Sequence, residues 1–207
     1  MMKGMGHPRR HAGRAFLRTA GSVVAVAALV SGCQDGAPDD PPAPGQQSAA
    51  LRVETVAGAE QLDERTRADL EAAVGDVLSA YVLEAFLGDF PREEFVRSFE
   101  SFTSRAASSA TRDIDLLTAA GTADATAVRA TDLDARLSFL TQSGTAHSGT
   151  AAVHFAFEAT LEDGTTQALV LDGRFLLEAD RDTWSIFGYD VAYDDGLGVP
   201  VETESTP

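Results

Sequence analysis

Residues 151–177 read AAVHFAFEATLEDGTTQALVLDGRFLL. Apolar side chains occupy the odd positions from Ala151 to Leu161, with mostly polar or small ones between them. A period of two predicts a strand that buries one face. Asp163-Gly164 is a strong signal for a tight hairpin turn, and the apolar odd positions resume from Leu169 to Leu177. The stretch therefore predicts two antiparallel strands that share one apolar face.

Further strands are predicted on both sides of this hairpin. Upstream, residues 133–139 alternate in the same way, from Leu133 to Phe139. Downstream, residues 183–193 are apolar at even positions up to Ile186 and at odd positions from Tyr189. Gly188 lies where the parity changes, and a β-bulge there would return both sets to one face. Together these segments predict an antiparallel four-stranded meander.

Helical patterns precede the strands. Apolar residues at spacings of three and four predict a long helix from Leu62 to Leu87. A second helix is predicted to begin near Pro91, because Phe95, Phe99 and Phe102 would share one face, and a third spans roughly Ser109–Thr118. Helices followed by strands predict an α+β fold, with N-terminal helices packed on a curved antiparallel sheet.

The start of the chain has the pattern of an export signal. A basic stretch from Lys3 to Arg18 precedes an apolar run, Ala20–Val30, which is shorter than the roughly 20 residues of a membrane-spanning helix. Val30-Ser-Gly-Cys33 then resembles the bacterial lipobox, and Cys33 is the only cysteine. The resemblance implies cleavage after Gly32 and lipidation of Cys33. It places the protein on the outer face of the cell membrane.

Four parts follow from these patterns. Residues 1–32 are predicted to be the signal peptide, and residues 33–50 the lipidated cysteine with a Pro-rich linker that has no large apolar side chain to bury. The folded domain is predicted to span residues 51–195, and an acidic tail residues 196–207.

The net charge of the chain limits the classes of molecule that it can bind. Five of the 16 Lys and Arg residues and none of the 32 Asp and Glu residues precede Cys33. The rest of the chain therefore has 11 basic against 32 acidic residues, a net charge of −21. So negative a chain disfavours binding to phosphate backbones, and no nucleic-acid partner is expected.

The order of helices and strands resembles the nuclear transport factor 2-like (cystatin-like) superfamily, in which a curved sheet wraps a long first helix and encloses a pocket. The ending DTWSIFGYDV, residues 182–191, looks like the closing strand of such domains in exported actinobacterial proteins, including those associated with mammalian-cell-entry transporters. Enzymes of the superfamily that resemble ketosteroid isomerase place a carboxylate and a tyrosine or histidine inside the cone.

The inner face predicted here is apolar and offers no proton acceptor. Its pocket-lining candidates are Tyr81, Phe155, Phe157, Phe175, Trp184 and Tyr189. The charged strand residues have the opposite parity and are expected to face solvent, as is His154; His147 is assigned to the turn region 143–149. No catalytic residue, cofactor or metal site is assigned, because no ligand spacing or catalytic motif is present.

Three functions remain open. The leading hypothesis is a noncatalytic module that binds a small apolar ligand or an envelope protein. The second is an isomerase or dehydratase, which would require Asp113 or Asp190 buried beside Tyr81 or Tyr189. The third is a scaffold in which two copies pair through the sheet.

Overall fold

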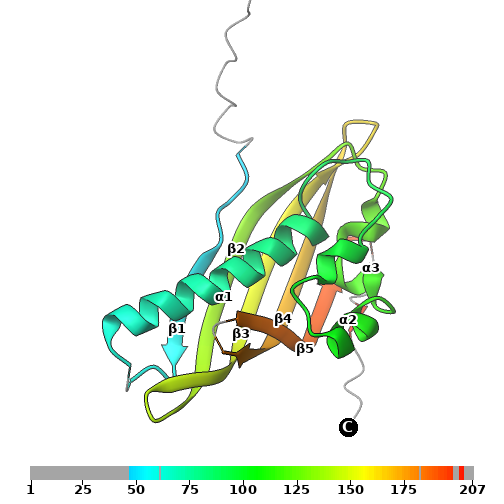
Figure 1. Ribbon diagram of the computed structural model, residues 1–207. Helices are drawn as coiled ribbons and strands as arrows, with labels where there is room; N and C mark the ends of the chain where they lie inside the picture. Colours follow the sequence, from blue (N-terminus) through cyan, green and yellow to red (C-terminus); the bar gives the residue numbers. More distant parts are fainter. Residues whose placement is uncertain (1–46, 61, 182, 198–200, 203–207) are drawn as a thin grey trace, which may run out of the picture. The chain divides into compact units, whose positions relative to one another are not determined.

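A computed structural model describes residues 47–60, 62–181, 183–197 and 201–202, and it confirms an α+β fold (Figure 1). The α-helices are α1 (Glu64–Ala85), α2 (Ser104–Ala110) and α3 (Ile114–Leu117), with 3-10 helices η1 (Val96–Phe99) and η2 (Ala119–Thr122). The strands are β1 (Arg52–Ala57), β2 (Ala127–Gln142), β3 (Thr145–Thr160), β4 (Thr166–Asp180), β5 (Thr183–Asp194) and β6 (Val201–Glu202).

The strands form one mixed sheet in the order β1-β2-β3-β4-β5-β6. Strands β2 to β5 pair with their chain neighbours in antiparallel fashion. The prediction of a four-stranded, purely antiparallel sheet is incomplete, because β1 adds a parallel edge strand and β6 a short antiparallel one. The segment that forms β1, RVETVA, has no buried side chain, so the alternation that revealed the other strands is weak there.

The parity change in the last strand is a β-bulge, as predicted. Leu176 pairs with Gly188 and Leu177 pairs with Ile186, so Phe187 is the extra residue. The bulge lets Ile186 before it and Val191 after it both lie in the buried core.

Helix α1 lies within its predicted range and covers one face of the sheet (Figure 1). It begins after Asp63, whose carboxylate accepts a 2.9 Å hydrogen bond from the Thr66 amide, an N-cap arrangement that satisfies one free donor of the first turn. The side chains of α1 that are buried against the sheet are Val74, Leu78, Tyr81, Val82 and Ala85. Fully burying one large apolar side chain stabilises the fold by about 2 kcal/mol.

The second predicted helix is wrong in its extent. Residues 91–95 are not helical, and only the short η1 forms after them. Arg92 holds this segment in another conformation, since its guanidinium donates to the carbonyls of Leu87 and Glu94. Phe95 and Phe99 are nevertheless buried, so their spacing identified core residues and not a helix.

The third predicted helix also differs. It is divided into α2, which the Thr103 hydroxyl caps, and the single-turn α3, with residues 111–113 between them. Near the ends of the domain, Ala49 donates a backbone hydrogen bond to Ala130, and Ser48 accepts one from Ala130. Residues assigned to the linker thus contact the sheet, and β6 falls within the segment assigned to the tail.

One glycine is required by the sheet. Gly173, in the middle of β4, has a φ of +143°. A β-carbon there would lie 2.3 Å from the Asp190 carbonyl oxygen on β5. No other residue type can let the two strands approach so closely.

Candidate functional site

The space between α1 and the sheet contains four of the six aromatic residues that were predicted to line a pocket. Tyr81, Phe155, Phe157 and Phe175 are each at most 2 % exposed. Phe86 of the α1 C-cap stacks on Phe157, with ring centroids 4.4 Å apart and an interplanar angle of 9°. The six predicted residues therefore come from the elements expected, and their role as the walls of an open pocket stays a prediction.

Tyr81 lies at the centre of this aromatic cluster. Its ring meets Phe175 edge-on at 5.1 Å, and its hydroxyl donates a 2.6 Å hydrogen bond to the Leu117 carbonyl. Burial raises the pKa of this hydroxyl well above its usual range. The Tyr81 hydroxyl proton therefore points at a backbone carbonyl and not into an open site. This hydrogen bond joins α1 to α3.

Tyr189 lies close to a carboxylate, the arrangement that an enzyme of the isomerase type would require. Its hydroxyl donates a 2.6 Å hydrogen bond to Asp113, the N-cap residue of α3, and both side chains are half-buried. The pKa of Tyr189 is raised, first by burial and then by this hydrogen bond to Asp113. One oxygen of the Asp113 carboxylate accepts the hydrogen bond of the Tyr189 hydroxyl, and the raised pKa makes this hydroxyl a weaker acid.

Tyr193 differs from the other two tyrosines. Its hydroxyl is buried and has no hydrogen-bond partner among the described residues. Burial raises its pKa, and Asp195 raises it further. A buried hydroxyl without a partner costs free energy, so this position tolerates the loss of the oxygen.

Trp184 lies at the other end of the sheet. The centroids of its ring and the Phe139 ring lie 5.6 Å apart, and it is one of the residues that line a groove of about 390 Å³. Leu70 and Ala73 of α1, Ala146 of β3 and Arg181 of the β4–β5 turn line the same groove. Trp184 is therefore separate from the aromatic cluster around Tyr81.

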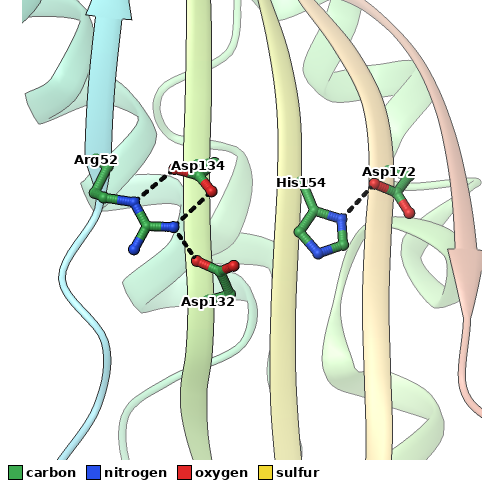
Figure 2. Close-up of polar contacts among 5 residues, drawn as sticks. All are labelled: Arg52, Asp132, Asp134, His154 and Asp172. Atoms are coloured by element: carbon green, nitrogen blue, oxygen red, sulfur yellow. Dashed lines mark hydrogen bonds and ion pairs between the residues drawn. The ribbon is translucent and has the colours of Figure 1, made fainter.

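The outer face of the sheet carries rows of paired charges, as the strand parity predicted. Figure 2 shows one row, in which Arg52 donates to both Asp134 and Asp132 and His154 hydrogen-bonds with Asp172. The four strands β1 to β4 place these residues side by side, since Arg52 pairs with Asp134, Asp134 with His154, and His154 with Asp172. Hydrogen bonds from Arg52 lower the pKa of Asp134.

These outer-face groups are solvated. The His154 and Asp172 side chains are 48 % and 57 % exposed, which confirms the expected surface position of His154. His147 is also exposed, but it lies in β3 and not in the turn to which it was assigned. Within the described ranges, no three His, Cys, Asp or Glu side chains converge in the way that a metal ion requires.

A second groove lies where α1 ends. It has a volume of about 680 Å³ and is lined by the end of α1, residues 88–94 and η1. Its residues are Leu83, Glu84, Leu87, Gly88, Asp89, Pro91, Arg92, Glu93, Glu94 and Arg97. The sequence reasoning missed this groove, because it placed residues 91–95 in a helix.

Cys33 lies outside the described residues. None of the helices in the described part of the chain has the length and hydropathy that crossing a membrane requires. No protein family, curated protein or solved structure matches the chain.

Proposed function

We propose that the chain is a lipid-anchored envelope protein whose domain acts as a noncatalytic protein-interaction module. The export signal and Val30-Ser-Gly-Cys33 support the anchor. The single observation that carries the interaction role is the packing of Tyr81, Phe86 and Phe157 between α1 and the sheet. In a nuclear transport factor 2-like cone, the ligand pocket would lie in that space.

This packing favours a partner protein over a small apolar ligand. Tyr81, Phe86 and Phe157 are at most 2 % exposed and contact one another through their rings. A ligand in the cone would have to displace these rings and lose their packing. A partner protein requires only surface, and the outer face of the sheet and the groove at the end of α1 both provide it.

Pairing of two copies through the sheet edges has less support. The Thr55 amide on the edge strand β1 donates to the Glu71 carboxylate of α1. On β5, Ile186 exchanges backbone hydrogen bonds with Ser101 and Thr103. Backbone groups of an edge strand that already have hydrogen-bond partners are not free to pair with a strand of another molecule.

The second candidate function is the isomerase-type enzyme, which the hydrogen bond between Tyr189 and Asp113 favours. In such an enzyme the carboxylate must remove a substrate proton while the hydroxyl donates to the oxyanion. Here the Tyr189 hydroxyl and the Asp113 carboxylate are hydrogen-bonded to each other. Catalysis would require a substrate that separates them.

Extraction of the full lipoprotein from the membranes of its own cell in mild detergent tests the interaction role. We expect it to migrate with a second protein in a fixed ratio, and the variants Asp113→Asn and Tyr189→Phe to keep that complex. Migration as a monomer would reject the interaction role. Migration as a dimer of identical chains would instead support the scaffold function.

A further inference from the structure

The groove at the end of α1 is lined by both apolar and acidic side chains. Leu83 lies on the exposed side of α1, where it lines the groove and is 53 % exposed. Leu87, half-buried, and Pro91 continue the apolar surface past the end of the helix. The groove has a volume of about 680 Å³, within the range of established ligand sites.

Arg92 gives this groove a fixed shape. Its guanidinium donates to the Leu87 and Glu94 carbonyls and to the Glu84 carboxylate, and it lies 4.9 Å from the centre of the Phe95 ring. The Arg92 side chain is only 16 % exposed. Its charge is therefore neutralised within the wall of the groove and does not attract an anion.

Besides Arg92 and Glu84, the groove has three acidic residues and one basic residue, Arg97. Asp89, Glu93 and Glu94 are exposed, and none of their carboxylates has an ion-pair or hydrogen-bond partner among the described residues. The other cation, Arg97, lies 3.5 Å from Glu100.

The last turn of α1 does not offset these carboxylates. The C-terminal end of a helix carries a partial negative charge, and α1 has no basic residue in its last turn. The exposed carboxylates and the apolar side chains of the groove together favour an occupant that is both cationic and apolar.

We propose that this groove binds a cationic amphipathic segment of the partner protein, with an apolar side chain on Leu83 and Leu87 and Lys or Arg side chains against Asp89, Glu93 and Glu94. This proposal rests on the proposed interaction role and names the surface and the chemistry of the partner. A membrane surface does not fit, because anionic headgroups would be repelled by the same carboxylates.

The test measures binding of a fluorescent amphipathic peptide, made of leucine and lysine in helical spacing, to the detergent-solubilised full chain. We expect Asp89→Asn, Glu93→Gln and Glu94→Gln combined to weaken binding about tenfold, since three exposed ion pairs are lost. A matched variant, Glu54→Gln, Glu162→Gln and Glu178→Gln, removes the same charge from exposed positions outside the groove. It should bind the peptide within about twofold of the wild type.

The apolar part of the proposal has its own variant. Leu83→Ser keeps the charge and should weaken binding about fivefold, while Leu140→Ser, at a leucine that is 68 % exposed and outside the groove, should not change it. All of these side chains are on the surface, so the variants are expected to fold.

The outcomes separate this proposal from the interaction role. Equal loss in the groove and matched triple variants would overturn the proposal, because the binding would then reflect net charge alone. Absence of peptide binding to the wild type would overturn it as well. If the groove triple variant is still extracted together with the partner protein in the normal ratio, the groove is not the binding surface, while the interaction role stands.

Discussion

The hydroxyl of Tyr189 on β5 donates a 2.6 Å hydrogen bond to the carboxylate of Asp113 at the start of α3. The pair links the last long strand to the helical segment that covers its edge. Tyr189→Phe should lower the free energy of unfolding by about 1 kcal/mol, because the half-buried carboxylate loses its partner. Urea denaturation measures the change. Tyr193→Phe is the control, since its hydroxyl has no partner among the described residues, and we expect it to be neutral or slightly stabilising. An equal loss in both variants would show that the hydrogen bond to Asp113 contributes nothing.

Alkaline pH should destabilise the protein. Burial raises the pKa of Tyr81, Tyr189 and Tyr193, which are the three tyrosines of the chain. An unfolded tyrosine loses its proton near pH 10, whereas the native ones keep theirs, so the unfolded state binds fewer protons above that pH. The free energy of unfolding should therefore fall as the pH rises past about 10. Tyrosinate absorbance during a pH titration should rise together with the loss of folded structure. Ionisation near pH 10 in the folded protein would contradict the burial.

The aromatic cluster should be sensitive to loss of volume. Phe157→Ala removes a ring that is 2 % exposed and stacked on Phe86, and it should cost about 4 kcal/mol of unfolding free energy. Phe187→Ala, at a phenylalanine that is 41 % exposed at the bulge, should cost less than about 1 kcal/mol. Chemical denaturation compares the two. A small cost for Phe157→Ala would mean that the space behind α1 is loosely filled and suited to a ligand.

The row of charges in Figure 2 should be visible as a carboxyl titration. Arg52→Gln should raise the pKa of Asp134 toward the ordinary value of about 4, because hydrogen bonds from Arg52 are the largest cause of its lowered pKa. Nuclear magnetic resonance of the carboxyl carbons measures this value. Arg174→Gln removes a guanidinium that pairs with Asp190 and should leave Asp134 unchanged.

The same interaction has a defined pH dependence. A carboxylate with a lowered native pKa stabilises the fold above its unfolded pKa, and this contribution is lost as the pH falls through the lowered value. Wild type and Arg52→Gln should therefore differ in stability at neutral pH and converge in strong acid. A constant difference at all pH values would contradict the role of Asp134.

Cys33 should decide the location of the protein. Cys33→Ser removes the sulfur that would carry the lipid, and we expect the variant to leave the membrane fraction. Two acyl chains give stable anchoring, so the wild type should stay with the membranes after a salt wash. Fractionation followed by immunodetection compares the two. Retention of Cys33→Ser with the membranes would reject lipidation as the anchor.

Much of the fold could be predicted because its strands are half-buried. Alternation of apolar and polar residues identified the faces of β2 to β5, and the parity change at Gly188 identified a real bulge. Helix α1 was predicted for the same reason, since its apolar stripe faces the sheet.

The other elements depend on contacts that local patterns do not contain. Strand β1 has no buried side chain and is positioned by pairing with β2, far along the chain. The segment after Pro91 takes its conformation from hydrogen bonds of Arg92, which the spacing of its phenylalanines does not reveal, and only the short η1 forms there. The partnership of Tyr189 with Asp113 was named only as one possibility, because the turn between α2 and α3 decides where Asp113 lies.

The proposed contact between the domain and another envelope protein lies at the groove at the end of α1. The direct test places a photoreactive amino acid at Leu83 in the full chain, expressed in its own cell and irradiated. Leu140, 68 % exposed on β2, is the matched position outside the groove. We predict one discrete crosslinked product with a second protein from Leu83 and none from Leu140. A product from Leu140 alone would show that the contact lies outside the groove. The absence of a product from both positions would contradict the proposed interaction with a second protein.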